Sequence, residues 1–243
     1  MDTEQTRILA HPRPVRPFAR AAVGIALIAA VTAGAAACGT GTTAAAAPGS
    51  SAAPVGLSSS QTSLRGPDPY AYLPKVPAFR LTSTTVRNGQ PLPAAQLSKM
   101  FKVPGGQDIS PQLTWSGFPK ATKSFVVSMY DPQAPTGSGF WHWVVIDIPA
   151  TTTSLLLDAG APSSRTLPPG AVQLADDAGV HQYVGGAPPA GSGTHDYYIT
   201  VTALDVSATG LPSTASPAYA GFAIGPHTLA RATIVCPTRA SGS

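Results

Sequence analysis

The sequence predicts a mainly β fold of the α+β class, an antiparallel β-sandwich-like domain with a few short helices. Three segments are short, rich in β-branched and aromatic residues and bounded by Pro and Gly clusters, which is typical of strands; they are Ser124–Asp131, His142–Pro149 and His195–Asp205. The chain also contains 26 prolines and 24 glycines, which favour many shaped turns. Long helical periodicity is absent, so an antiparallel sandwich is the class that fits best.

The chain of 243 residues is expected to hold one folded domain, over residues 79–237, followed by a short tail at 238–243. Residues 38–78 are predicted to form a disordered tether and a lead-in to the domain. Most of this segment is Gly, Thr, Ala, Ser and Pro without periodicity, and such a composition buries too little apolar surface to order itself.

Residues 1–37 resemble a secretory signal peptide, because four arginines precede an uncharged Ala-rich stretch that ends in small residues. The following Ala35-Ala36-Ala37-Cys38 resembles a lipobox, although Ala35 stands where leucine is usual. We therefore predict a bacterial lipoprotein, lipidated at Cys38 and anchored to the outer side of the cell membrane. Cleavage within the Ala run, which would give a secreted protein, and an uncleaved signal anchor are the alternatives.

Within the domain, short helices are expected at Leu92–Phe101 and around His227–Arg231. After Cys38 the only cysteine is Cys236, so an internal disulfide is not expected. Cys236 ends the apolar run Ala-Thr-Ile-Val-Cys, and we interpret it as a buried thiol that acts as a small hydrophobe.

Two of the predicted strands begin with a histidine that directly follows a Gly-rich loop. Period-two alternation places each histidine on a face that continues as apolar core, the two sets being His142, Val144, Ile146 and Ile148, opposite Trp143, Val145 and Asp147, and His195, Tyr197, Ile199, Val201 and Ala203. One such histidine is more often a satisfied core or rim residue than a ligand. Two in equivalent places are expected to converge at one end of a sheet.

The distribution of charge and the available motifs exclude several functions. The net charge is +4, four of the arginines lie in residues 1–37, and the remaining cations are scattered, which argues against nucleic-acid binding. Glu4 is the only glutamate, neither Gly-Ser-Gly segment is a nucleophile elbow, and no P-loop or dinucleotide fingerprint is present. We therefore predict no catalytic residues and no cofactor, leaving a zinc site of one Asp and two His as a minor alternative.

Three segments carry a specific resemblance. They are Ser-Pro-x-Leu-x-Trp at 110–115, the loop Asp-Pro-Gln-Ala-Pro at 131–135 with Trp141-His142, and the loop Tyr-Val-Gly-Gly-Ala-Pro-Pro-Ala-Gly-Ser-Gly-Thr-His-Asp-Tyr at 183–197. These three motifs occur in the same order as in the phosphatidylethanolamine-binding protein family. The chain resembles the Raf-kinase-inhibitor-like bacterial branch of that family from about Phe79 to Cys236.

The resemblance implies a small rigid pocket for phosphate, acetate or a phospholipid head group. Imidazoles, a phenol and backbone N–H groups of a turn suit an oxyanion, and Asp131 is expected to orient a histidine. Gln133 stands where the family usually has an acid, and we expect it beside the anion. The pocket residues that the resemblance implies are Asp131, Pro135, Trp141, His142, Ala187, Pro188, Pro189, His195 and Tyr197.

The predicted function is a membrane-tethered binding module for an anionic group. The first alternative is a protein-interaction inhibitor of a protease or kinase, which the family's inhibitor-like members imply. The second, a hydrolase or transferase that acts on a phosphorylated substrate, is less favoured because no catalytic motif is found.

Overall fold

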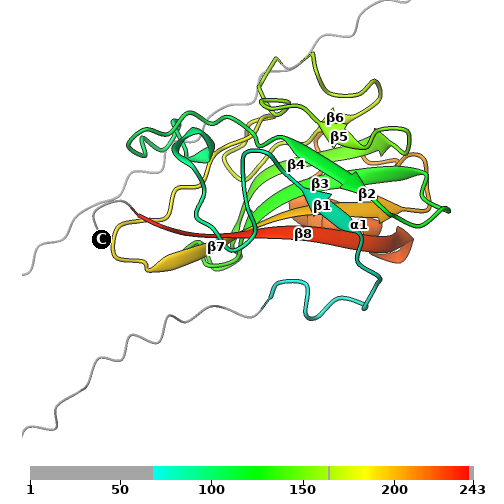
Figure 1. The fold of residues 1–243 in the computed structure, drawn as a ribbon, viewed down its shortest axis with the longest axis horizontal. Coiled ribbons are helices and arrows are strands. Elements are labelled where there is room, and N and C mark those ends of the chain that lie inside the picture. Colours follow the sequence, from blue (N-terminus) through cyan, green and yellow to red (C-terminus); the bar gives the residue numbers. More distant parts are fainter. Residues whose placement is uncertain (1–67, 164, 241–243) are drawn as a thin grey trace, which may run out of the picture. The chain divides into compact units, whose positions relative to one another are not determined.

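The computed structural model describes residues 68–163 and 165–240, and it shows two antiparallel sheets (Figure 1). The described strands are β1 (Arg80–Thr82), β2 (Leu113–Ser116), β3 (Ser124–Asp131), β4 (Phe140–Pro149), β5 (Ser154–Leu155), β6 (Val172–Gln173), β7 (Thr194–Leu204) and β8 (Thr228–Arg239). The helical elements are the α-helix α1 (Pro217–Ile224) and the 3-10 turns η1 (Ala94–Gln96) and η2 (Gly225–His227). The predicted mainly β fold is confirmed.

The larger sheet has the order β6-β4-β3-β7-β8 and the smaller sheet the order β1-β2-β5. The main core contains side chains of both sheets, including Trp115 and Leu155 from the small sheet and Phe125, Trp143 and Ile199 from the large one. Phe125 contacts Trp115 edge-on, with ring centroids 5.4 Å apart. This aromatic contact stabilises the packing of the small sheet against the large sheet.

A second, smaller core lies under α1. It contains Val126, Val144 and Ile146 of the large sheet together with Ala220 of the helix. Ser216 caps α1, because its hydroxyl accepts a hydrogen bond from the Tyr219 amide, and Pro217 occupies the first helical position. The large sheet is therefore buried on both faces.

The outer edge of β8 is covered along much of its length by residues that precede β2. The Arg231 amide donates to the Pro77 carbonyl. Both backbone polar groups of Val235 are also hydrogen-bonded: its amide donates to Asn88 Oδ1, and its carbonyl accepts from the Gly89 amide. Near the end of the strand, Pro237 has no N–H to offer.

The predicted strands are confirmed: Ser124–Asp131 coincides with β3, and the other two differ from β4 and β7 by at most two residues at an end. The predicted helix at Leu92–Phe101 is wrong except for the single turn η1. The backbone there pairs with a distant segment instead, since Leu97 bridges Gly186 and the Ser98 amide donates to the Gly186 carbonyl.

The helix predicted around His227–Arg231 is also wrong, because from Thr228 this segment belongs to β8 and pairs with β7. The α-helix lies just before it, and the Ser216-Pro217 pair that begins it was a readable signal. Cys236 is buried and unpaired, in agreement with its interpretation as a core residue.

The face alternation predicted for β7 is confirmed, because Tyr197, Ile199, Val201 and Ala203 all lie in the main core. The alternation predicted for β4 is partly wrong. Register shifts relative to β3 occur at His142 and around Asp147, whose φ is +58°. These bulges place Ile148 in the main core with Trp143 and Val145, whereas Val144 and Ile146 face α1.

The signal peptide, Cys38 and most of the tether lie outside the described residues. Of the lead-in, residues 68–78 are described, and Tyr70 packs edge-on against Tyr198 of β7. No helix in the described ranges is long and apolar enough to cross a membrane.

Candidate functional site

One end of the large sheet carries a cavity of about 530 Å³, because three strand ends meet there. β3 ends at Asp131, and its two antiparallel neighbours, β4 and β7, begin at Phe140 and Thr194. Strands that alternate in direction bring these ends to one edge, so both Gly-rich loops lie at the same place. Asp131 and His142 line the cavity together with the Pro188-Pro189 turn.

His142 is the bulged residue at the start of β4, and its ring lines the cavity. Its Nδ1 lies 3.0 Å from the Val184 carbonyl oxygen. A carbonyl only accepts, so Nδ1 carries the proton and Nε2 is the acceptor nitrogen of the neutral ring. Burial lowers the pKa of His142 to about 4, and the charge of Asp131 only partly offsets this. His142 is therefore a neutral imidazole near pH 7.

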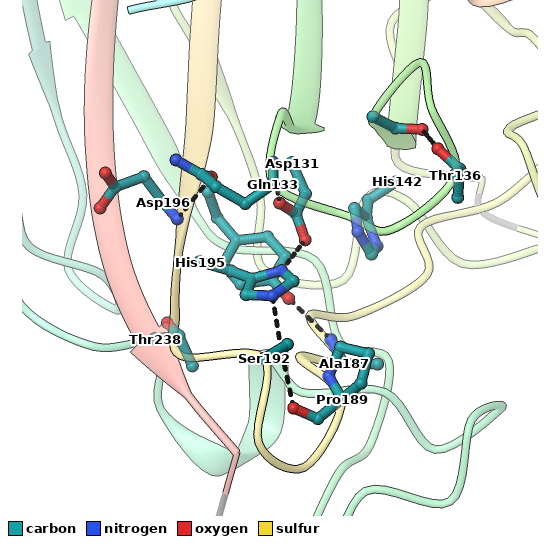
Figure 2. Close-up of polar contacts among 12 residues, drawn as sticks. Asp131, Gln133, Thr136, His142, Ala187, Pro189, Ser192, His195, Asp196 and Thr238 are labelled. Atoms are coloured by element: carbon teal, nitrogen blue, oxygen red, sulfur yellow. Dashed lines mark hydrogen bonds and ion pairs between the residues drawn. The ribbon is translucent and has the colours of Figure 1, made fainter. Parts of the chain in front are cut away.

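His195 has a different environment, at the head of a chain of short hydrogen bonds that Figure 2 shows. Its Nδ1 lies 2.7 Å from Asp131 Oδ2, and its Nε2 lies 2.7 Å from Ser192 Oγ. Ser192 Oγ is also 2.7 Å from the Pro189 carbonyl oxygen. Since the serine has one proton, it donates either to Pro189 or to His195, and in the first case His195 must be the doubly protonated donor.

Asp131 and Tyr197 complete the wall behind the cavity. Asp131 Oδ1 accepts from the Gln133 amide at 2.9 Å, so both of its carboxylate oxygens are bonded. The Tyr197 hydroxyl accepts from the Ala187 amide at 3.0 Å, and the Tyr197 ring contacts His142 edge-on. Burial, followed by the charge of Asp131, raises the pKa of Tyr197, so this phenol stays protonated. These contacts fix the Ala187 turn relative to both histidines.

The structure brings together most of the residues that the sequence singled out. Six of them line the cavity, namely Asp131, Pro135, His142, Ala187, Pro188 and Pro189. His195 and Tyr197 lie directly behind, bonded to Asp131 and Ala187. Trp141 is the exception: it lies on the opposite face, where it stacks against Tyr130 with ring centroids 4.3 Å apart. The bulge at His142 places its ring on the same face as Trp143, and Trp141 points to the face under α1.

Two further expectations need correction. Gln133 does not line the cavity; its Oε1 accepts from the Asp196 amide at 3.0 Å, which ties the first loop to β7. The Pro-Pro turn offers few backbone donors to an oxyanion, because the Ala187 amide is bonded to Tyr197 and the two prolines have no N–H.

Sequence reasoning missed the loop that supplies the remaining wall. Phe101 and Lys102 line the cavity from it, and Phe101 packs edge-on against Phe140. Asp108 holds this loop in place, since its Oδ1 accepts from the Gly185 amide and its Oδ2 from the Met100 amide. In the sequence, Asp108 only precedes the Ser-Pro-x-Leu-x-Trp motif by two residues. Nothing local signalled Lys102, because its position depends on this long-range clamp.

Among the described residues, no group of three or more His, Cys, Asp or Glu side chains is arranged to hold a metal ion. His181 and His227 lie apart from the cavity. His181 Nδ1 contacts the Gln173 carbonyl, and His227 pairs with Asp205 in an exposed contact.

These features define a class of protein: a single β-sandwich domain with a partly apolar, histidine-lined cavity at the end of its larger sheet. Comparison with known proteins gives the family. Residues 82–239 match the model of the phosphatidylethanolamine-binding protein family, and the chain belongs to that family.

Two proteins of Escherichia coli are close relatives. The chain is 43% identical to UPF0098 protein YbcL over 157 residues, which are 65% of this chain and 85% of that protein. It is 44% identical to UPF0098 protein YbhB over 158 residues, which are 64% of this chain and 97% of that protein.

Solved structures agree with these comparisons. The crystal structure of Escherichia coli YbcL is 41% identical in sequence and has a TM-score of 0.64. The match covers 98% of that protein and 66% of this chain. A phosphatidylethanolamine-binding protein homologue from Chlamydia trachomatis is 26% identical, with a TM-score of 0.55 and coverage of 97% of its length and 67% of this chain.

Proposed function

We propose that this protein is a binding module whose cavity takes a small anionic group, such as phosphate or a phospholipid head group. The observation that carries the proposal is the convergence of Lys102 and His142 on one cavity. Lys102 supplies a cation. His142 supplies an acceptor when it is neutral, which suits a ligand that keeps one acidic proton, and a second cation when it is protonated.

Calorimetric titration of the full chain with inorganic phosphate and with phosphoethanolamine tests this. His142→Ala and Lys102→Gln should each weaken binding by about 1–3 kcal/mol, the range for charge-assisted hydrogen bonds. Lys99→Gln is the matched control, because Lys99 lies on the same loop, is exposed and does not line the cavity. If the two cavity variants bind as tightly as the control does, the anion does not bind in this cavity.

The pH dependence has a definite sign. An anion in the cavity favours protonated His142, so binding is accompanied by proton uptake at a group whose pKa is about 4 without a bound anion. Affinity for phosphate should therefore fall as pH rises above that value. In His142→Ala this dependence should flatten, leaving the titration of the phosphate itself.

We propose further that the domain is held at the outer side of the membrane through lipidated Cys38. The support is the Ala-Ala-Ala-Cys exit of residues 35–38. Cys38→Ser should move the protein from the membrane fraction to the soluble or secreted fraction. Retention in the membrane of a variant that still carries its N-terminal arginines would indicate a signal anchor instead.

A second candidate function rests on the Ser192–His195–Asp131 chain. A hydroxyl bonded to an imidazole that is itself bonded to a carboxylate is the arrangement of an activated nucleophile. In a hydrolase of this kind Ser192 Oγ would attack a phosphoryl or acyl group, His195 would take its proton, and the leaving alcohol would receive that proton. The binding function ranks first because Ser192 does not line the cavity.

Turnover of p-nitrophenyl phosphate and p-nitrophenyl acetate tests the second candidate. Hydrolysis that is lost in Ser192→Ala and retained in Ser138→Ala, from the other Gly-Ser-Gly loop, would establish it. Absence of turnover, or equal rates in the two variants, would exclude Ser192 as a nucleophile. An inhibitor role toward a protease or kinase stays a prediction.

A further inference from the structure

A second cavity lies on the opposite face of the large sheet, under α1. It has a volume of about 290 Å³ and is lined by the sheet, by α1 and by the segment that precedes β1. Its floor combines the apolar Val126 and Val144 with the hydroxyl side chains of Ser128 and Thr202. Trp141 lines this cavity, while its neighbour His142 lines the first one. The two cavities are therefore separated by the thickness of the sheet.

The charged side chain at this cavity is Arg231 of β8, which is partly buried. It lies over the Tyr70 ring, 5.9 Å from the ring centroid, and one guanidinium nitrogen donates to the Pro74 carbonyl at 3.3 Å. Neither ion pair found among the described residues involves Arg231. A guanidinium has five N–H donors in a geometry that matches a carboxylate, so most of its capacity is unused by acidic groups of the protein.

The Tyr70 ring forms part of the cavity wall next to Arg231. Its hydroxyl is buried beside Ser128 and Thr200, with less than 1 Å² of it accessible, so it lies behind the wall and out of reach of a ligand. The guanidinium of Arg231 is therefore the charged donor that the cavity offers to an anionic head group.

We propose that this cavity binds a single-chain alkyl carboxylate. The alkyl chain packs against Val126, Val144 and Trp141, and the carboxylate accepts from Arg231. Ligand sites for small molecules are commonly about 300–1,000 Å³, so this cavity is at the lower limit and suits one short chain rather than a two-chain lipid. The proposal is independent of the anion site around His142.

The chemistry of the walls favours this occupant over others. An alkyl ammonium would bring a second cation to Arg231, and a neutral alcohol would leave the guanidinium without a carboxylate. A ligand with an anionic head group and one short apolar chain can bind both Arg231 and the apolar side chains of the cavity.

Quenching of tryptophan fluorescence by brominated decanoate tests the proposal in the full chain, below the concentration at which decanoate forms micelles. All three tryptophans are in the described part of the chain, and Trp115 and Trp143 lie in the main core on the far side of the sheet. Saturable quenching is expected in the wild type and should be largely lost in Trp141→Phe. Quenching that persists in Trp141→Phe, or no saturable quenching at all, would overturn the proposal.

Variants of the cavity define the chemistry. Gly221 lines the cavity, and a Cβ added there would meet no heavy atom within 4 Å, so Gly221→Leu should fill it without a clash and block decanoate. Leucine is also the better helix former, which protects the fold. Ala218→Leu, on an exposed position of α1 away from the cavity, is the matched control and should bind as the wild type does.

Head-group specificity is read from competition against the brominated probe. Arg231→Gln should weaken decanoate about tenfold or more and leave decanol unchanged, because only the carboxylate uses the guanidinium. Inorganic phosphate should not displace the probe. Equal affinity for decanoate, decanol and decyltrimethylammonium, displacement by phosphate, or unchanged decanoate binding in Gly221→Leu would each contradict the assignment.

Discussion

The two Gly-Ser-Gly loops of this protein share a sequence and a location but have different environments. In the first, Ser138 offers its carbonyl to the Tyr130 hydroxyl, and the histidine that follows, His142, bonds a backbone carbonyl. In the second, the Ser192 hydroxyl bonds the ring of His195, which is held by Asp131. One histidine is isolated and neutral, and the other belongs to a polar chain. The difference shows that a short motif acquires chemistry from the groups that surround it.

Spacing contributes to this difference. His195 comes three residues after its serine, and β7 begins without a bulge, so the ring can reach back to the loop. His142 comes four residues after Ser138 and is itself the bulged residue of β4. Asp131 lies at the start of the first loop, but its carboxylate holds His195, the histidine that follows the second loop. Four predictions test this comparison, beginning with the largest effect.

Removing each histidine should give unequal losses of stability. His195→Ala leaves the buried Asp131 carboxylate without its ring partner, which costs about 3–5 kcal/mol. His142→Ala loses one hydrogen bond to a carbonyl beside an open cavity, and about 1–2 kcal/mol is expected. Urea unfolding of both variants provides the measurement. Equal losses would mean that the Asp131 pair is no more important to the fold than the Val184 contact.

The glycines that end the two loops should differ as well. Gly139 and Gly193 both have positive φ, so alanine is strained at either position by about 1–2 kcal/mol. At Gly139 an added Cβ would also lie 2.2 Å from the Tyr130 hydroxyl and 2.8 Å from the Asp131 carbonyl oxygen, whereas at Gly193 it would meet nothing within 4 Å. Gly139→Ala should therefore lose about 1–3 kcal/mol more than Gly193→Ala. Thermal unfolding of the pair decides this, and similar melting temperatures would contradict it.

The lowered pKa of His142 predicts a loss of stability in acid. The unfolded ring binds a proton near pH 6.5 and the folded ring only near pH 4, so between these values the unfolded state holds more protons and stability falls as pH falls. The full effect is about 3 kcal/mol. Asp176 acts in the opposite direction, because burial raises its pKa to about 6 and its contribution to stability is lost as pH rises.

Comparison of the wild type with His142→Asn isolates the histidine, since Asp176 is present in both. The asparagine amide can donate to the Val184 carbonyl as Nδ1 does, but it does not titrate. The difference in unfolding free energy between the two proteins should change by about 3 kcal/mol from pH 7 to pH 4. A difference that does not change with pH would show that His142 is not desolvated.

The smallest effect concerns the two serines. Ser192→Ala removes a hydrogen bond to a buried ring and should lose about 0.5–1.5 kcal/mol of stability. Ser138→Ala leaves the backbone carbonyl that Tyr130 uses, so its unfolding free energy should stay within about 0.5 kcal/mol of the wild type. Chemical denaturation of both resolves the difference. A larger loss from Ser138→Ala would reverse the comparison.

Local pattern predicted the strands well because their side chains are selected by burial. β3, β4 and β7 are dense in β-branched and aromatic residues, and the motifs marked the loops between them. Pattern did not predict the bulges at His142 and Asp147, since a bulge depends on how a strand pairs with its neighbour. For that reason His142 was grouped with Val144 and Ile146, which lie under α1, although its ring lines the cavity on the other face. Lys102 was missed because its position depends on contacts with a segment distant in sequence. Ser192 was missed because it lies in a loop, where no regular period predicts the direction of a side chain.

The covered edge of β8 has a consequence for the behaviour of the protein at high concentration. A strand of twelve residues at the margin of a sheet is a template onto which another chain can add and start aggregation. Here Pro77 and the Asn88-Gly89 turn occupy backbone groups on that margin, and Pro237 removes one donor from it. Pro77 and the Asn88-Gly89 turn thus keep neighbouring molecules from joining their sheets through β8.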